Sequence, residues 1–221
     1  MPETTLTRRA ELLRIAAHLF ATKGYRNTTV RDIADAAGIL SGSLYHHFPS
    51  KESMLDEILR TFQDQLFEEY DAILDASDDA RTKLERGVRV SFAAIAEHHD
   101  EVAIFQNDST FIASLDGFSY ISERHEQSRD FWLRLLHEGV VSGVLRKDLD
   151  VDVVYRFLRD GIWFAVNWYR PDGSLTTAEV ADRYSAMLLD GIATPAPPVV
   201  EEDAKRPSRN HAPARPAPPA G

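Results

Sequence analysis

An unbroken helical pattern of apolar residues from Lys51 to Asp75 constrains the fold of this 221-residue chain more than any other feature. Apolar side chains recur there every three or four positions, at Met54, Leu55, Ile58, Phe62, Leu66, Phe67, Tyr70 and Ile73. Pro49 interrupts the chain just before this segment, and Ser50 is a favourable N-cap. A helix of this length spans roughly 40 Å. We therefore expect a helix that leaves one packing unit and enters another, as a lever between them.

The helical spacing of apolar residues continues through the rest of the chain, and no stretch shows strand-like alternation of useful length. Gly, Pro, Ser and Asp break the pattern at intervals. Besides the helix at Lys51–Asp75, these breaks predict a pair of short helices between Thr28 and Phe48. They also predict helices at Thr7–Gly24, Ala80–His99, Asp100–Phe105, Phe118–Ser142, Val151–Tyr169 and Thr176–Gly191. Predicted caps are Thr7, Thr29, Asp150 and a Thr176–Glu179 capping box. We therefore expect an all-α protein of about nine helices.

Charge is unevenly distributed along the chain. The formal net charge is −10, yet residues 8–60 carry eight Lys or Arg and six Asp or Glu, a balance of +2 that leaves −12 for the remainder. A mild local positive charge beside an acidic body suggests specific, dimer-dependent DNA binding. Cysteine is absent, and no apolar run resembles a signal peptide or a membrane span. We expect a cytoplasmic protein without disulfides or membrane association.

Residues 28–48 form a pattern of two short helices joined by a tight turn. Thr29 is the expected N-cap of the first helix, and Gly38 supplies the left-handed backbone that ends it. The second helix is expected over Leu40–Phe48, with Leu44 and Phe48 at inner positions. Its outer positions are small or uncharged and can form hydrogen bonds: Ser41, Gly42, Ser43, Tyr45, His46 and His47. Such a face is typical of a helix in the DNA major groove, although two amphipathic helices around a glycine can also be ordinary packing.

The segments TTVRDIADAAGI and SGSLYHHFPSKESML closely resemble the DNA-binding domain of the TetR family of bacterial repressors. The resemblance implies a TetR-like fold and a homodimer that binds palindromic double-stranded DNA. It divides the chain into a flexible N-terminus at residues 1–6, a helix-turn-helix DNA-binding domain at 7–51, and a ligand-binding and dimerisation domain at 52–193. Residues 194–221 hold eight of the eleven prolines, which predicts a disordered tail.

The resemblance also implies roles at the DNA surface. Tyr45 matches a family tyrosine that contacts phosphate, and His46 beside it can contact a phosphate or a base. Lys51 begins the next helix, where its ammonium and the free backbone N–H groups can hold a phosphate. The other candidates are Thr29 and Arg31 for the DNA backbone and Leu40, Ser41, Gly42 and Ser43 for base edges. The second helix carries no Arg, Asn or Gln for a bidentate base contact. One domain alone is therefore expected to be weakly specific, which favours a dimer on two half-sites.

The segment Val151–Tyr169 indicates where the larger domain forms a dimer. It is too apolar for the surface of a monomer, so it needs a partner surface. The candidate dimer contacts are Phe157, Phe164, Trp168, Tyr184 and Met187, although core packing explains them equally well.

A second stripe runs along the same segment, with Asp152, Arg156, Arg159, Trp163, Val166 or Asn167, and Arg170 at spacings of three or four. Arginine beside tryptophan here forms an ion pair with Asp152 or Asp160, or binds an anionic ligand that has a bulky apolar part. The candidate ligand contacts are Arg159, Trp163, Asn167, Phe67, Tyr70, Phe92, Ile95 and Phe105, although each apolar residue alone is more often core.

Other chemistries find little support in the sequence. His98 and His99 point to different sides of a helix, so we do not expect one metal ion to bind both. No nucleophile–base pair, phosphate loop or pair of catalytic carboxylates is visible. We expect neither catalysis nor a cofactor.

Within the TetR family, the segments GILSGSLYHHF, FSYI, DLDVDVVYRFLRD and WYRP resemble repressors of cholesterol catabolism in mycobacteria and rhodococci. This resemblance implies an acyl-CoA inducer, a coenzyme A thioester of a steroid-ring catabolite, and it places Arg159 and Trp163 among the residues that contact it. The expected mechanism has two states, in which the inducer changes the separation of the recognition helices through the helix at Lys51–Asp75. A different hydrophobic anion or a protein partner is the alternative effector.

Overall fold

The computed structural model describes residues 2–192, and their side chains from residue 8 onward. In this part of the chain it consists of α1 (Pro2–Lys23), α2 (Val30–Ala36), α3 (Ser41–Tyr45), α4 (Lys51–Asp75), α5 (Ala80–Glu97), α6 (His99–Ile112), α7 (Tyr120–Ser142), α8 (Val151–Trp163), the 3-10 helix η1 (Phe164–Asn167) and α9 (Thr177–Ile192). The predicted all-α fold is confirmed. No helix among these residues is both long and apolar enough to cross a membrane. The tail predicted to be disordered, residues 194–221, lies outside the described residues.

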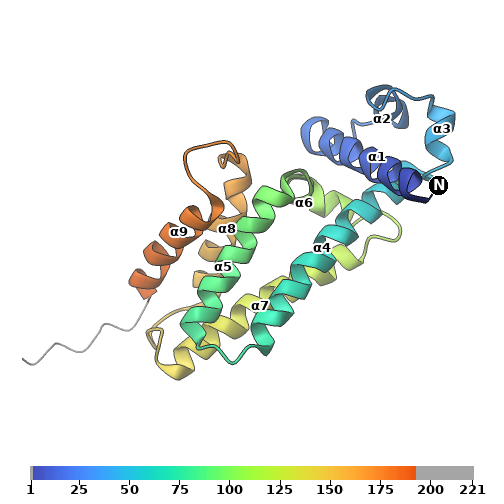
Figure 1. The fold of residues 1–221 in the computed structure, drawn as a ribbon. Helices are drawn as coiled ribbons and strands as arrows, with labels where there is room; N and C mark the ends of the chain where they lie inside the picture. The colour runs from blue at the N-terminus through green and yellow to red at the C-terminus, as the bar shows by residue number, and fades with distance from the viewer. Residues whose placement is uncertain (1, 193–221) are drawn as a thin grey trace, which may run out of the picture.

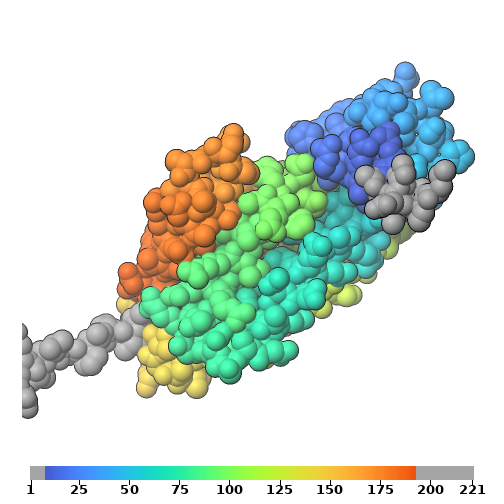
Figure 2. Space-filling view, in the orientation of Figure 1, coloured from blue at the N-terminus to red at the C-terminus, as the bar shows by residue number. Residues whose placement is uncertain are grey.

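The molecule is elongated, with α1, α2 and α3 at one end and α8 and α9 toward the other (Figures 1 and 2). Helix α4 runs between them and belongs to two hydrophobic clusters. Its first half packs with α1, α2 and α3 through Met54, Leu55, Ile58 and Leu59. Its second half packs with α5 and α7 in a larger cluster that also contains residues of α8 and α9, and it contributes Phe62, Leu66, Tyr70 and Ile73. This confirms the expectation of one helix that connects two packing units.

Helix α6 forms a second connection between the two ends. Val102 near its start is buried in the larger cluster, whereas Ile104 and Ile112 are buried in the N-terminal one. Polar contacts also join α6 to α1 and to the loop that follows α1, where the N–H of Tyr25 donates to Asp108 at 3.3 Å. The Nδ1 atom of His18 lies 3.2 Å from Oδ2 of Asp100. The N-terminal domain therefore rests on α6 as well as on α4.

Most of the predicted helix caps are confirmed, but Thr7 lies inside α1 and is not its cap. Thr29 caps α2 in a capping box with Asp32, and Ser50 caps α4. Asp150 caps α8 by accepting from the N–H of Val153 at 3.1 Å. Gly38 has a φ of +66°, the left-handed conformation that a turn at this position requires.

Four predicted helix boundaries were wrong. Helix α6 continues to Ile112 rather than ending at Phe105. Helix α1 begins at Pro2 rather than at Thr7, and proline is well suited to a first helical position. Helix α3 ends at Tyr45 rather than at Phe48, since the N–H of His46 turns back to the carbonyl of Ser43 at 3.2 Å before the chain reaches its proline.

The fourth boundary lies in the segment 151–169. Helix α8 ends at Trp163, and the chain continues as the 3-10 helix η1 instead of running on to Tyr169. Ala165 and Val166 of η1 are buried. The carbonyl of Val166 lies 3.1 Å from Nε2 of His99 on α6, so a tertiary contact holds the tighter turn.

Candidate functional site

Helix α3 presents the predicted recognition face at one end of the molecule. Leu40 at its N-cap is 81% exposed, and Tyr45 in its last turn is 54% exposed. Leu44 and Phe48 are buried in the N-terminal cluster, as predicted. Among the other outer residues of this helix and its end, Gly42 and His46 are exposed, whereas Ser41, Ser43 and His47 are half-buried. This surface carries apolar, hydroxyl, backbone and imidazole groups, which suits contact with base edges and phosphates.

The side chain of Lys51 is used inside the domain. Its ammonium donates to the carbonyl of Tyr25 and to the carbonyl of Thr28, each at 2.9 Å. It also lies 4.0 Å from the centre of the Tyr25 ring. Burial lowers the pKa of this ammonium. The expectation that the ammonium itself holds a phosphate does not fit these contacts, so a phosphate at this helix start would rely on backbone N–H groups.

The supporting helix α2 offers two different side chains to the DNA backbone. The hydroxyl of Thr29 is engaged by Asp32 at 2.6 Å as part of the capping box. The side chain of Arg31 is 85% exposed and lies 3.7 Å from the carboxylate of Asp35. Because so exposed an ion pair is weak, the Arg31 guanidinium is available to a phosphate.

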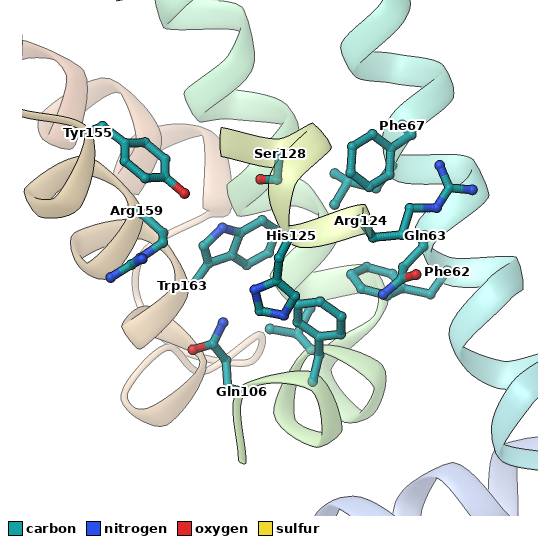
Figure 3. Close-up of a pocket in the computed structure, with 13 residues that line it drawn as sticks. Phe62, Gln63, Phe67, Gln106, Arg124, His125, Ser128, Tyr155, Arg159 and Trp163 are labelled. Atoms are coloured by element: carbon teal, nitrogen blue, oxygen red, sulfur yellow. The ribbon is translucent and has the colours of Figure 1, made fainter. Parts of the chain in front are cut away.

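A cavity of about 70 Å³, partly open to solvent, lies in the larger domain. It is lined by Phe62, Gln63, Leu66 and Phe67 of α4, Val102, Phe105 and Gln106 of α6, Arg124, His125 and Ser128 of α7, and Tyr155, Arg159 and Trp163 of α8. Figure 3 shows Arg159 and Tyr155 on one side of this cavity and Gln63 and Phe67 on the other. Its lining is largely aromatic and aliphatic with a few polar groups, the usual composition of a small-molecule site.

Four of the predicted ligand contacts meet in this cavity, namely Arg159, Trp163, Phe67 and Phe105. The predicted ion pair also forms, since Nε of Arg159 donates to the neighbouring Asp160 at 2.8 Å. Both carboxylate and guanidinium are substantially exposed, so this pair is weak and leaves Arg159 able to meet an anion at the cavity mouth.

The other four predicted ligand contacts lie outside the cavity. Tyr70 is core, stacked on Phe131 with ring centres 4.0 Å apart. Phe92 and Ile95 are buried in the larger cluster on α5. Asn167 is exposed on η1, where its side chain donates to the carbonyl of Phe164 at 3.1 Å. Apolar periodicity shows which residues face inward but not whether they meet a cavity or a filled core.

The sequence analysis did not identify several residues that line the cavity. Gln63 carried a usable signal, because it is a polar residue in an apolar stripe between Leu59 and Leu66. Arg124 and His125 carried no comparable signal, since polar residues surround them in the sequence. Only the packing of α7 on α4 and α8 brings them to the cavity.

The cavity mouth is rich in arginine. A shallow depression lined by Arg129, Arg156 and Arg159, together with Glu126 and Asp152, adjoins the cavity and shares His125, Tyr155 and Arg159 with it. Burial, with the positive charge of Arg159, lowers the pKa of His125. An apolar cavity therefore opens onto a surface with three arginines, of which Arg129 is paired with Asp152 and Arg159 with Asp160. Because these exposed ion pairs are weak, an anionic group can compete for the guanidinium groups.

The predicted dimer face is exposed and apolar at four of its five positions. Phe157 and Met187 are each 71% exposed, Phe164 is 65% exposed and Trp168 is 51% exposed. Tyr184 differs, because its hydroxyl donates to the carbonyl of Leu158 at 3.0 Å and its ring packs against Phe92. Tyr184 therefore joins α9 to α8 within one chain.

His98 and His99, the two histidines considered as metal ligands, make separate contacts. His98 packs beside the ring of Phe62, with centres 5.4 Å apart. His99 contacts the carbonyl of Val166. They face different surroundings, as expected of neighbours on a helix.

Comparisons with known proteins match this architecture. The family "Bacterial regulatory proteins, tetR family" matches residues 12–58, and "Tetracyclin repressor-like, C-terminal domain" matches residues 77–192. The chain is 53% identical to the repressor KstR2 of Rhodococcus jostii, over 85% of this chain and 92% of that protein. It is 51% identical to the solved structure of the ketosteroid regulator KstR2 of Mycobacterium tuberculosis, with a TM-score of 0.83 over 85% of this chain and 96% of that one.

A more distant structure shares the fold. AibR, solved in complex with isovaleryl coenzyme A and operator DNA, is 24% identical, with a TM-score of 0.71 over 82% of this chain and 98% of that one. The two family matches together span the helix-turn-helix and the larger domain, and the KstR2 relatives are identical to this chain at about half of the aligned positions. The chain belongs to the TetR family of transcriptional repressors.

Proposed function

We propose that this protein represses genes of steroid catabolism, binding a palindromic operator as a homodimer and leaving it when a coenzyme A thioester of a steroid-ring catabolite is bound. The identity to the KstR2 repressors over nearly their whole length supports the class of genes. The single observation that supports the class of inducer is the apolar cavity that opens beside Arg129, Arg156 and Arg159.

An acyl coenzyme A combines the two chemistries that this site offers. Its acyl group is apolar and would occupy the space between the aromatic rings of Phe67, Phe105 and Trp163. Its phosphates carry several negative charges and would meet the arginines at the mouth, for which planar guanidinium groups are well suited. A neutral steroid would leave the arginines unused, and a simple dianion would leave the cavity unfilled.

The lever in this mechanism is α4. The residues Phe62, Gln63, Leu66 and Phe67 of α4 line the cavity. One to two turns earlier, Leu55 and Ile58 of the same helix are buried against the DNA-binding helices. A ligand that favours a different position of α4 would move the α3 helices of both subunits relative to each other. The operator is then released to the extent that the ligand binds the two states with different affinities.

The homodimer is supported by the apolar face of α8, η1 and α9. Its residues Phe157, Phe164, Trp168 and Met187 are each at least half exposed in the single chain. Such a surface is typical of one that a partner covers. A dimer also supplies two copies of α3, which the uncharged recognition face needs for specificity.

A mobility-shift titration on DNA from upstream of the protein's own gene tests this function. Steroid-ring coenzyme A thioesters should release the DNA at concentrations where free coenzyme A and the free acids do not. Arg159→Met should bind the DNA with wild-type affinity and require at least tenfold more thioester for release. Arg89→Met is a matched control, because Arg89 is an exposed arginine that pairs with Asp182 outside the cavity.

The outcomes separate the parts of the proposal. DNA binding that no thioester reverses would exclude this class of inducer and leave a repressor of another kind. Normal release of Arg159→Met would remove Arg159 from the site.

A further inference from the structure

Gln63 is buried in the cavity wall with its amide unpaired. Its side chain is 2% exposed, and neither Oε1 nor Nε2 has a hydrogen-bond partner among the described residues. Its neighbours along the same face of α4 are Leu59, Leu66 and Phe67, which are all apolar. An amide in such surroundings is unfavourable unless a partner satisfies it. The partner is therefore expected to come from outside the protein.

Gln63 differs from the other buried polar groups that lack a partner. Tyr120, Trp132 and Ser185 also leave one polar atom unpaired, but none of them lines this cavity. Gln63 leaves both a donor and an acceptor unpaired, and it lines the cavity from the side opposite Arg159, as Figure 3 shows. A ligand held by its anionic group at Arg159 would thus place its far, apolar end near this amide.

We propose that Gln63 is a specificity-determining residue that recognises a hydrogen-bonding oxygen, a ring ketone or hydroxyl, at the end of the ligand remote from the anion. This inference rests on the proposed function, because it assigns the far end of the same ligand. A ketone oxygen accepts from Nε2, and a hydroxyl can accept from Nε2 or donate to Oε1. A purely apolar acyl group of the same shape would leave the amide unpaired and is disfavoured.

The position of Gln63 also couples recognition to release. Gln63 follows Leu59 by one helical turn, and Leu59 is fully buried against the DNA-binding helices. A hydrogen bond to Gln63 is therefore a direct ligand contact on α4. A ligand that bears the oxygen is expected both to bind more tightly and to release the operator more completely than one without it.

A matched pair of ligands and a matched pair of variants test this inference. The ligands are the coenzyme A thioesters of cyclohexylpropanoic acid and of the same acid carrying one ring ketone. Their dissociation constants are measured by calorimetry on the full-length wild type and on Gln63→Leu. Gln65→Leu is the control, because Gln65 lies on the same helix but is exposed and does not line the cavity.

Wild type and Gln65→Leu should prefer the keto ligand by roughly tenfold. Gln63→Leu should lose that preference, through weaker binding of the keto ligand and equal or tighter binding of the ligand without the ketone. A merely structural role of Gln63 would shift both dissociation constants by the same factor and would overturn the inference. Equal binding of both thioesters to the wild type would overturn it while leaving the proposed function standing. Failure of the wild type to bind either thioester would overturn this inference, whereas the proposed function is overturned only if the steroid-ring thioesters also fail to bind.

Discussion

The internal use of Lys51 leads to a prediction that separates a folding role from a DNA-contact role. Lys51→Met keeps the length and apolar stem of the side chain and removes its ammonium. Two hydrogen bonds from a charged donor are lost, to the carbonyls of Tyr25 and Thr28, each 2.9 Å long. Such bonds contribute about 1.5–3 kcal/mol each when they are well shielded.

Water reduces that value here, because the side chain of Lys51 is only half-buried. Methionine also keeps a favourable contact with the ring of Tyr25. We therefore expect a net loss of about 2 kcal/mol in the free energy of unfolding. For a protein of this size the melting temperature should fall by about 4–8 °C.

The assay combines thermal unfolding with operator titrations at several salt concentrations. Arg31→Met is the matched control, since this side chain is 85% exposed and has only a weak ion pair. Arg31→Met should leave the melting temperature unchanged and reduce the salt dependence of operator binding by about one ion per domain. Lys51→Met should lower the melting temperature and leave the salt dependence unchanged. A stable Lys51→Met protein with a reduced salt dependence would refute the reasoning and restore the ammonium as a phosphate ligand.

Three further predictions concern the other faces of the molecule. Tyr45→Ala should weaken operator binding roughly tenfold in a mobility shift. The melting temperature should not change, because Tyr45 is 54% exposed. An unchanged affinity for the operator would exclude contact between Tyr45 and DNA. Phe157→Asp should raise the dimer dissociation constant by at least about 100-fold in sedimentation experiments, because two aromatic side chains lose burial; an intact dimer would place the interface elsewhere. Because burial and Arg159 lower the pKa of His125, a bound anion should raise that pKa and binding should take up a proton. Thioester affinity should therefore increase as pH falls through the ordinary histidine range, and His125→Phe should reduce this slope in calorimetry; an identical slope in the variant would exclude His125 from the linkage.

Much of the fold could be predicted because local chemistry determines where these helices begin and end. Thr29, Ser50 and Asp150 accept from backbone N–H groups that would otherwise lack partners, and they do so whatever the tertiary structure. The end of α8 could not be predicted in this way. It depends on the contact between η1 and His99, which is more than sixty residues away in the sequence.

The candidate site was only half predictable for a related reason. Arg159 and Trp163 stand out because they are one turn apart on an apolar helix. Tyr70 and Phe92 have the same sequence character as Phe67 and Phe105, yet they pack against Phe131 and Tyr184 and fill core space. The distinction depends on how α7 and α9 pack, which sequence periodicity does not report.

The proposed coupling between cavity and operator can be tested most directly through its reciprocity. Calorimetry would give the affinity of a steroid-ring coenzyme A thioester for the free dimer and for the dimer bound to its operator. If occupancy of the cavity and the position of α4 are linked to DNA binding, operator DNA must weaken thioester binding by the same factor by which the thioester weakens operator binding. That factor is expected to lie between about 5 and 150. Equal thioester affinity in the presence and absence of operator would contradict the proposed mechanism.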